Sequence, residues 1–294
     1  MRILNFGSLN LDYVYRVPHF VAPGETLAAQ QQSLHFGGKG LNQSVALARA
    51  GAPVYHAGCV GQGGAPLAAF LKENGVDTTL LRQADCPQGS AVIQVTEAGE
   101  NSILLFGGSN QAITPEQVEE VLAQFDQGDY LVLQNEISCI DCLVRRAAQK
   151  GMQVVLNPSP FHQSLLELDY NAIAWLLINE VEARQLTGKS HPQEVWAALH
   201  QKYPRLKVVL TLGAGGSVCF TPEQIIEQPV FAVRVVDTTA AGDTFTGFFL
   251  AALVEGQPLA ACMRRAAMAA AISVSRPGAA SSIPTAREVC GRTV

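Results

Sequence analysis

One short stretch late in the chain, Asp237-Thr238-Thr239-Ala240-Ala241-Gly242-Asp243, combines a turn of small residues with an acid. It follows a strand-like run, Phe231–Val236, and precedes a helix expected over Ala241–Leu253. Backbone N–H groups at the start of a helix have no partner inside the helix, and they bind anionic oxygen. The pattern therefore indicates phosphoryl transfer: the amides of residues 240–243 would hold the transferred group, and Asp243 would accept the proton of the attacking hydroxyl.

The same spacing leaves a second interpretation of Asp243 open. Aspartate often caps a helix by accepting a hydrogen bond from an N–H group of the first turn. Asp243 stands where such a cap would stand, at the start of the expected helix. The residues alone do not separate a helix cap from a catalytic base.

A glycine-rich stretch, Phe36-Gly37-Gly38-Lys39-Gly40-Leu41-Asn42-Gln43, is the second candidate. It lacks the GxxxxGK[ST] spacing of a P-loop. Paired glycines let the backbone approach a ligand closely and can act as a hinge. Lys39 and Asn42 would lie one turn apart on the same side of a helix over Gly40–Ala50. Taken alone, the pattern is more typical of a solvent-exposed lysine in a turn.

Two polar residues, Asn10 and Asp12, come directly after the first expected strand, Ile3–Leu9. Because side chains alternate along an extended chain, both would face the same way. Open α/β sheets bind ligands at the carboxyl ends of their strands. An amide and a carboxylate placed there suit the hydroxyl groups of a sugar, although turn chemistry would also explain the pair.

The elements that must position these residues follow a regular order. Apolar runs typical of strands buried on both faces alternate with helical patterns, which predicts a three-layer αβα sandwich around a mainly parallel sheet. The expected strands are Ile3–Leu9, Val54–Val60, Tyr130–Gln134, Gln153–Leu156, Trp175–Ile178 and Val208–Leu212, and the expected helices are Gly40–Ala50, Ala65–Asn74, Ala241–Leu253 and those beginning after Thr114 and at Asn179.

Two segments, 11–36 and 89–106, alternate like strands but have no helix after them. The turn Glu97-Ala98-Gly99-Glu100 inside the second segment indicates a hairpin. We expect the two segments to form a small β subdomain, a lid inserted into a single α/β domain that covers residues 1–294.

Composition excludes several classes of protein. Charged residues make up 15% of the chain, the net charge is −5 and the pI is about 5.7, whereas disordered and nucleic-acid-coating chains are highly charged. The longest apolar runs, such as the seven residues Ala172–Ile178, are far shorter than the ~20 residues that span a bilayer. No apolar leader with a cleavage site follows Met1, so we expect a cytoplasmic protein without nucleic-acid or membrane partners.

The seven cysteines form no disulfide framework, which suits a reducing compartment. Cys139 and Cys142 form a CxxC pair, a spacing found in zinc and redox sites. A zinc site needs two further ligands, and no second CxxC or closely spaced histidine pair is present. We therefore interpret the pair as two ordinary thiols near the start of a helix.

Together these segments resemble the ribokinase (PfkB) family of carbohydrate kinases, nearly from end to end. The stretch Gly37–Ala46 is similar to the family's first signature, and Asp237–Phe245 is similar to its second and more specific one. Further ribokinase-like segments lie in order at Gly7–Asp12, Pro23–Thr26, Leu156–Pro160, Asn179–Ala183 and Thr211–Gly216.

The resemblance implies a role for each matching position at the reaction centre. Asp243 would be the catalytic base, and Ala240, Ala241 and Gly242 would form the anion hole for the transferred phosphoryl group. The sugar hydroxyls would be held by Asn10, Asp12, Gly38, Lys39, Asn42 and Glu136.

The resemblance also implies ATP as the phosphoryl donor, with magnesium and an activating potassium ion. Asn179 and Glu182 match an NxxE motif linked to the magnesium and phosphate region. The nucleotide would lie on Thr211, Leu212, Gly213, Ala214, Gly215 and Gly216. Potassium would be bound, largely through carbonyl oxygens, near Asp237, Thr239, Ser273, Arg276, Gly278 and Ser282.

Two departures from the family's pattern concern specificity. Gly61-Gln62-Gly63-Gly64 replaces a commonly acidic turn, and the helix over Ala267–Ile272 offers no polar side chain to a nucleobase. The best candidate activity is ATP-dependent phosphorylation of D-ribose to D-ribose 5-phosphate, in a homodimer formed through the lid. A kinase for a nucleoside, a ketohexose or 2-keto-3-deoxygluconate is the alternative, as is a catalytically silent sugar-binding regulator.

Overall fold

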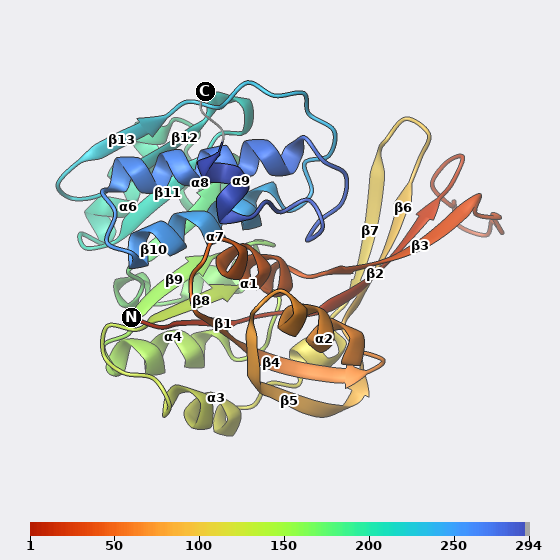
Figure 1. Ribbon diagram of the computed structural model, residues 1–294, viewed down its shortest axis with the longest axis horizontal. Helices are drawn as coiled ribbons and strands as arrows, with labels where there is room; N and C mark the ends of the chain where they lie inside the picture. Colours follow the sequence, from red (N-terminus) through yellow and green to blue (C-terminus); the bar gives the residue numbers. More distant parts are fainter. Residues whose placement is uncertain (292–294) are drawn as a thin grey trace.

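The computed structural model describes residues 1–291 and shows a large sheet of nine strands with helices on both faces, beside a separate small sheet (Figure 1). The large sheet has the strand order β13-β12-β11-β10-β9-β8-β1-β4-β5. All neighbours pair in parallel except β11–β12 and β12–β13, which are antiparallel. The strands are β1 (Ile3–Phe6), β4 (Val54–Gln62), β5 (Asp77–Pro87), β8 (Tyr130–Gln134), β9 (Gln153–Asn157), β10 (Trp175–Asn179), β11 (Lys207–Thr211), β12 (Ser217–Phe220) and β13 (Ile225–Gln228).

Helices cover both faces of this sheet because its strands are apolar on both sides. Ile3 of β1 packs in the core beneath α1, α7 and α8, whereas its neighbour Leu4 packs in a second core beneath α3 and α4. The three-layer αβα sandwich expected from the sequence is confirmed. The helices are α1 (Lys39–Arg49), α2 (Ala65–Glu73), α3 (Pro115–Leu122), α4 (Ile140–Gln149), α5 (Glu180–Thr187), α6 (Pro192–Lys202), α7 (Ala241–Val254), α8 (Leu259–Val274) and α9 (Ala286–Cys290), with short 3₁₀ turns η1 (Gly108–Gln111), η2 (Gln163–Glu167), η3 (Tyr170–Ala172) and η4 (Gly213–Gly215).

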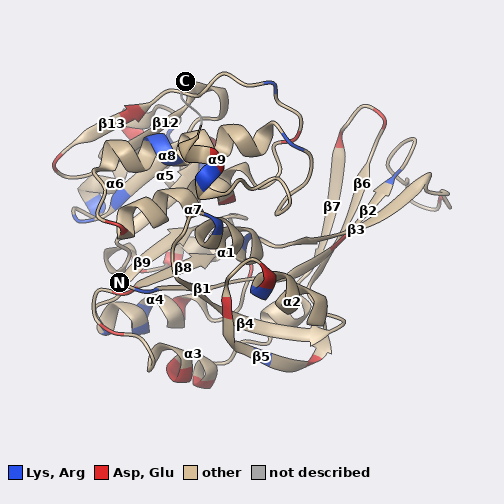
Figure 2. Cartoon of the chain, viewed as in Figure 1, with Lys and Arg blue, Asp and Glu red and all other residues tan. Residues whose placement is uncertain are grey.

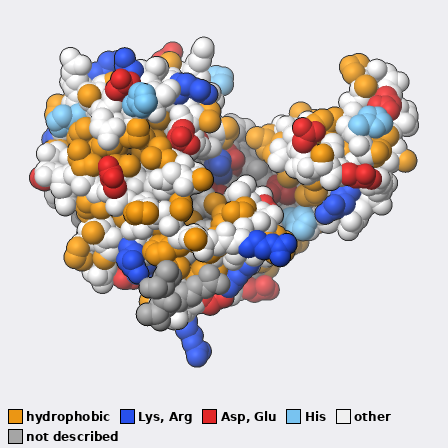
Figure 3. Space-filling view, turned by 90° about the horizontal axis from the view of Figure 1, so that it is seen from above, with side chains coloured by type: hydrophobic (Ala, Val, Ile, Leu, Met, Phe, Trp, Pro, Cys, Tyr) orange, Lys and Arg blue, Asp and Glu red, His pale blue; other side chains and the backbone are white. Residues whose placement is uncertain are grey.

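The small sheet contains β2 (Asn10–Arg16), β3 (Gln31–Gly37), β6 (Ser90–Val95) and β7 (Asn101–Phe106), in the order β3-β2-β6-β7. The expected hairpin is present as the antiparallel pair β6–β7, and β2–β6 is parallel. The sheet projects from the body, and the space-filling view shows an open notch between the two (Figures 1 and 3).

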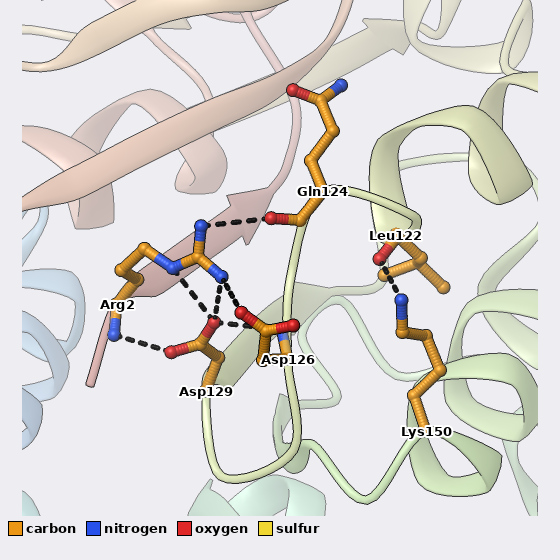
Figure 4. Close-up of polar contacts among 6 residues, drawn as sticks. All are labelled: Arg2, Leu122, Gln124, Asp126, Asp129 and Lys150. Carbon is orange, nitrogen blue, oxygen red and sulfur yellow. Dashed lines mark hydrogen bonds and ion pairs between the residues drawn. The ribbon is translucent and has the colours of Figure 1, made fainter.

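The beginning of β1 is tied to the loop before β8 by a cluster of polar contacts (Figure 4). The Arg2 guanidinium donates to the carboxylate of Asp129 at 3.0 Å and to the carbonyl oxygen of Gln124 at 2.9 Å. The backbone N–H of Arg2 also donates to Asp129, at 2.8 Å. These contacts hold β1 and β8 in register at the centre of the sheet.

The first strand is shorter than the sequence suggests, because the chain leaves the ladder after Phe6. Asn110 binds both backbone groups of Leu9: its Oδ1 accepts from the N–H at 2.9 Å and its Nδ2 donates to the carbonyl at 3.2 Å. Gly40 presses on the same bend, since a Cβ at residue 40 would lie 2.3 Å from the Ser8 nitrogen. Strand β2 therefore starts at Asn10 and belongs to the small sheet.

The strand expected over Phe231–Val236 is absent, and this segment is irregular. Phe231 at its start packs against the core, and at its end the N–H groups of Val236 and Asp237 donate to the Val274 carbonyl at 2.8 and 3.2 Å. The apolar alternation that suggested a strand instead places Phe231, Val233 and Val235 along a cavity.

Charged side chains lie mainly on helices, turns and loops, and strands β1, β8, β9 and β10 contain none (Figure 2). In residues 1–291, no helix combines the length and apolar character needed to cross a membrane. Within the same residues, no group of three or more His, Cys, Asp or Glu side chains could hold a metal ion. All seven cysteines are free thiols, and Cys139 is the N-cap of α4.

Candidate active site

Close contact between α1 and α7 builds the centre of the site. A Cβ placed on Gly247 would lie 2.4 Å from the Cβ of Ala46, so the two helices meet where neither carries a larger side chain. Asp243 precedes Gly247 by one helical turn, and Asn42 precedes Ala46 by one turn. The crossing therefore brings the starts of the two helices together.

Asp243 is held there by two side-chain amides. Asn42 Nδ2 donates to Asp243 Oδ2 at 3.0 Å, and Gln43 Nε2 donates to Oδ1 at 2.9 Å. The residue is only 6% exposed. Helix α7 has no side-chain cap hydrogen bond. The helix-cap interpretation of Asp243 is therefore wrong.

The start of α7 also presents backbone amides. Ala240, the N-cap, has a φ of 60°, in the left-handed region, and this turns the chain sharply into the helix. The N–H of Ala241 donates to the Thr238 carbonyl at 3.2 Å, so the expectation that all four amides of residues 240–243 are unpaired is wrong for this one. The amides of Gly242 and Asp243 occupy the helix positions whose N–H groups point outward. A Cβ at Gly242 would meet no atom within 4 Å, so the space in front of it is open.

Two cavities meet at this helix start, one of about 560 Å³ and one of about 210 Å³. Of the expected nucleotide-binding turn, Thr211, Gly213, Ala214 and Gly216 line the larger cavity. Leu212 and Gly215 do not, and they instead close the turn by a backbone hydrogen bond of 2.8 Å. The residues that line both cavities are Thr211, Thr238, Ala241, Gly242 and Phe245.

Lys39 lines the smaller cavity, together with Asp243. Burial alone would lower the pKa of Lys39, but the carboxylates of Asp243, Glu136 and Glu182 outweigh burial and raise it. The side chain therefore stays cationic in a half-buried position. The interpretation of the glycine-rich stretch as a turn with a solvent-exposed lysine is wrong.

Glu136 follows β8 and faces the start of α1. Its Oε2 accepts a 2.9 Å hydrogen bond from the backbone N–H of Lys39, and the hydroxyl of Ser8 donates to the same oxygen. Burial raises the pKa of Glu136, against the opposing effect of the Lys39 charge. Gly38, with a φ of 91°, makes the turn that brings this N–H to the carboxylate.

Asn10 and Asp12 lie on one face of β2, so the turn interpretation of this pair is wrong. Asn10 Oδ1 accepts from Asn110 Nδ2 at 2.7 Å, which fixes the orientation of its amide. Asp12 packs over the backbone of Gly37: a Cβ at residue 37 would lie 1.9 Å from Asp12 Oδ2. Burial, and secondly the negative charge of Glu136, raises the pKa of Asp12 to about 7.

Asn179 and Glu182 line the smaller cavity and also cap α5. Asn179 Oδ1 accepts from the N–H of Glu182 at 2.9 Å, and Glu182 Oε2 accepts from the N–H of Asn179 at 3.1 Å. This is a capping box, which an N-x-x-E spacing before a helix indicates by itself. Our sequence analysis missed this structural role.

The residues expected at a monovalent cation lie where two loops meet. Asp237 Oδ2 accepts from the N–H of Gly278 at 2.9 Å, and its Oδ1 accepts from both the N–H and the hydroxyl of Thr239. The hydroxyls of Ser273 and Ser282 are 2.8 Å apart. Arg276 turns outward to pair with Glu288. The structure therefore brings five of the six residues together and directs the sixth side chain away.

Three residues that the sequence analysis did not single out hold the site in place: Gln43, Asn110 and Gln88. Gln88 Nε2 donates to the Leu9 carbonyl at 2.6 Å and its Oε1 accepts from the N–H of Gly61 at 2.9 Å. A Cβ on Gly64 would lie 1.9 Å from that Oε1, so Gln88 occupies the space beside the non-acidic turn. Gln43 was within a recognised motif, but the other two have no sequence pattern around them.

Comparison with known proteins gives one consistent result. The pfkB family carbohydrate kinase profile matches residues 2–286. A ribokinase from Haemophilus influenzae is 39% identical over 292 residues, covering 96% of this chain and 95% of its own length. A crystal structure of ribokinase from Cryptococcus neoformans in complex with ADP has a TM-score of 0.87 at 33% identity and covers 99% of both chains. The Arabidopsis thaliana ribokinase complexed with ribose and ATP has a TM-score of 0.83 at 30% identity, covering 98% of this chain and 97% of its own.

Proposed function

Because the chain belongs to the pfkB family of carbohydrate kinases, and is therefore a sugar kinase, we propose that it transfers the terminal phosphoryl group of ATP to the 5-hydroxyl of D-ribose. The observation that carries the proposal is the position of Asp243. Its carboxylate is held by Asn42 and Gln43 in the smaller cavity, at the helix start that the larger cavity shares.

The chemistry follows from this arrangement. The sugar hydroxyl gives its proton to a carboxylate oxygen of Asp243 while its own oxygen forms the new bond to the terminal phosphorus of ATP. The bond from that phosphorus to the bridging oxygen breaks, and ADP leaves with the electron pair. Outward-facing amides of Gly242 and Asp243, together with the cationic Lys39, stabilise the charge on the transferred group.

The sugar would lie between the body and the small sheet, both of which contribute side chains suited to hydroxyl groups. Asn10 and Asp12 come from the small sheet, and Lys39, Asn42 and Glu136 come from the body. Asn42 Oδ1 is buried, and no atom of the described chain donates to it. A sugar hydroxyl would satisfy such an acceptor, whose burial otherwise costs free energy.

Magnesium bound to the nucleotide would lie near Glu182 and Asn179. Magnesium prefers one or two carboxylates and completes its shell with water and phosphate oxygen. The smaller cavity suits this preference, because Glu182 is the one glutamate among the described residues that line it. When bound, it would neutralise phosphate charge. A potassium ion would lie at the loops joined by the Gly278–Asp237 hydrogen bond. Measuring turnover with sodium in place of potassium tests that part of the proposal.

The small sheet would act as a lid. Four chain crossings join it to the body, and paired glycines lie at two of them, Gly37-Gly38 after β3 and Gly107-Gly108 after β7, positions at which backbone torsion can change easily. Closure over the sugar would exclude water, which could otherwise accept the phosphoryl group.

A screen for ADP release tests the proposal. Purified protein is assayed with ATP, magnesium and potassium against D-ribose, 2-deoxy-D-ribose, ketohexoses, 2-keto-3-deoxygluconate and nucleosides. We expect the highest kcat/KM for D-ribose and phosphorylation at its 5-hydroxyl. Strong turnover of another substrate without turnover of ribose would replace the substrate while leaving the kinase chemistry intact. Sugar binding without any ATP turnover would refute the proposed chemistry.

A further inference from the structure

A chain of buried polar side chains runs beneath α1 and ends at Asp243. It consists of Gln43 and Ser44 on α1, Asn5 on β1, Gln134 on β8 and His56 on β4. All five are 0% exposed, between the central strands of the large sheet and α1. Burying polar groups is costly unless they are hydrogen-bonded, so a connected row of five indicates a specific task.

The hydrogen bonds connect without a gap. Gln43 Nε2 donates to Asp243 Oδ1 at 2.9 Å, and Gln43 Oε1 accepts from Gln134 Nε2 at 2.7 Å. The same Gln134 nitrogen donates to Asn5 Oδ1 at 2.9 Å. Asn5 Nδ2 in turn donates to the Gly40 carbonyl and to the Ser44 hydroxyl, both at 2.8 Å.

The chain has only one possible direction, because its anchors can only accept. The backbone carbonyl of Gly40 requires the nitrogen end of the Asn5 amide, which turns Asn5 Oδ1 toward Gln134. Gln134 must then present its nitrogen, and Gln43 must receive it with oxygen. The nitrogen of Gln43 is thereby left facing the carboxylate of Asp243. If any one of these amides were flipped, it would place oxygen against oxygen.

The far end of the chain is consistent with this direction. The Ser44 hydroxyl accepts from Asn5 and lies 2.7 Å from His56 Nδ1, to which its own proton can be donated. That nitrogen can accept only on a neutral ring. Burial lowers the pKa of His56 to about 4, so the ring is neutral near pH 7.

We propose that Gln43 is a positioning residue for Asp243, and that Gln134 and Asn5 fix the direction in which the Gln43 amide points. The amide donates to one carboxylate oxygen while Asn42 donates to the other, so the carboxylate cannot rotate. Gln43 is fully buried and acts through Asp243. This inference rests on the proposed function, in which Asp243 is the base.

The test replaces Gln43 by methionine, which keeps the length of the side chain but neither donates nor accepts strongly. We expect kcat to fall by about 10- to 100-fold, the cost of a misplaced catalytic group. KM for the sugar and for ATP should stay within about twofold, because Gln43 does not contact either. Gln134→Met should have the same pattern with a smaller loss of kcat.

A matched control is Gln117→Met. Gln117 is also a buried glutamine, 1% exposed, and its amide donates to the Gly58 carbonyl at 3.0 Å, but it lies on α3 against the other face of the sheet. The Gln117→Met variant should lower the melting temperature about as much as Gln43→Met does, and its kcat should stay unchanged. This comparison separates lost stability from lost positioning.

A double variant provides a readout that a structural role would not change. If Gln43 acts through Asp243, then Gln43→Met combined with Asp243→Asn should be no slower than Asp243→Asn alone. Independent, multiplying losses would overturn the inference, as would a folded Gln43→Met variant with wild-type kcat or one changed only in KM. Full activity of Asp243→Asn itself would instead refute the proposed function, because there would be no base to position.

Discussion

Gly247 on α7 packs directly against Ala46 on α1, and the space between them does not admit a Cβ atom: one built on Gly247 would lie 2.4 Å from the Ala46 Cβ and 2.8 Å from the Ala46 carbonyl carbon. Asp243 and Gln43 lie about one turn away from this contact. The distance between the Asp243 carboxylate and the Gln43 amide that donates to it therefore depends on a glycine that lines neither cavity.

Gly247→Ala should consequently impair both stability and turnover. The added methyl group must push the helices apart, and overpacking of a core typically costs about 1–3 kcal/mol. We expect a lower melting temperature and a lower kcat, measured by thermal unfolding and by ADP release. Gly242→Ala is the control for stability, since a Cβ there meets no atom within 4 Å, and its melting temperature should match the wild type. An unchanged kcat in Gly247→Ala would show that the crossing does not set the geometry of the base.

Asp243→Asn should reduce kcat by at least ~10²-fold, because the amide cannot accept the proton of the sugar hydroxyl. Sugar affinity, measured by calorimetry, should change little, since the other hydroxyl-binding side chains remain. Turnover near the wild-type rate would contradict the role of base that we assign to Asp243.

Sugar binding should depend on pH through Asp12, whose pKa burial raises to about 7. A carboxylate accepts a hydroxyl proton more strongly when ionised, so KM for the sugar should fall as pH rises through about 7. Glu136 also faces this site, and His35 lies opposite Asp12 in the register of the small sheet. Asp12→Asn keeps both of these groups and should remove the part of the pH dependence that is due to Asp12. A KM profile identical in the two proteins would exclude Asp12 from the sugar site.

The same shift has a consequence for stability, with a definite sign. Between about pH 4 and pH 7 the unfolded chain has released the Asp12 proton while the folded chain retains it, so the free energy of unfolding should fall as pH rises across this window. Asp12→Asn should lack this decline. Chemical denaturation of both proteins at several pH values measures the difference.

The nucleobase should be selected weakly. The described residues that line the larger cavity include neither an ionisable nor an amide side chain. An apolar pocket discriminates by only about 10- to 200-fold, whereas a pocket built to hydrogen-bond its ligand reaches 10⁴ or more. We expect kcat/KM for ATP to exceed that for GTP by less than about 200-fold, and Ala267→Asn should change the ratio. A preference of 10⁴-fold in the wild type would show that backbone groups select the base.

A second copy of the chain should cover part of the small sheet. Leu34, Tyr13, Val92 and Leu104 form one row across its four strands, and Leu104 is 72% exposed. Apolar patches of this kind mark interaction surfaces. Sedimentation should give a mass about twice the 31.3 kDa of one chain, and Leu104→Asp should yield monomers. Ile103→Asp changes the opposite face of the sheet, so comparing its mass with that of Leu104→Asp shows which face forms the dimer. A monomeric wild type would refute the proposal.

The parts of the fold that depend on local pattern were predictable from the sequence. Strand β8 has the bounds expected, because its apolar run is uninterrupted and turns flank it. The end of β1 was not predictable, since it depends on Asn110, which is 101 residues away from Leu9. The alternating segment 231–236 resembled a strand, but no neighbouring strand pairs with it.

The residues of the candidate site also fall into a group that the sequence predicted and a group that it did not. Motif residues such as Lys39 and Asp243 are brought together by the fold as expected from the resemblance. The buried amides are different, because a single glutamine at the end of an apolar strand has no periodicity that distinguishes it. The one available signal was that Asn5 and Gln134 are polar residues inside runs that are otherwise apolar.

The contrasting surroundings of Asp243 and Asp12 imply that warming should displace Asp12 at a lower temperature than Asp243. Asp243 on α7 is linked through Gln43 and Gln134 to β8 at the centre of the large sheet, which we expect to open only with global unfolding. Asp12 lies on a sheet whose strand β7 is exposed along its entire length, so that strand loses little buried surface when it detaches. On warming, the kinase should therefore release its sugar while its catalytic base is still in place, and inactivation should begin below the melting temperature and reverse on cooling.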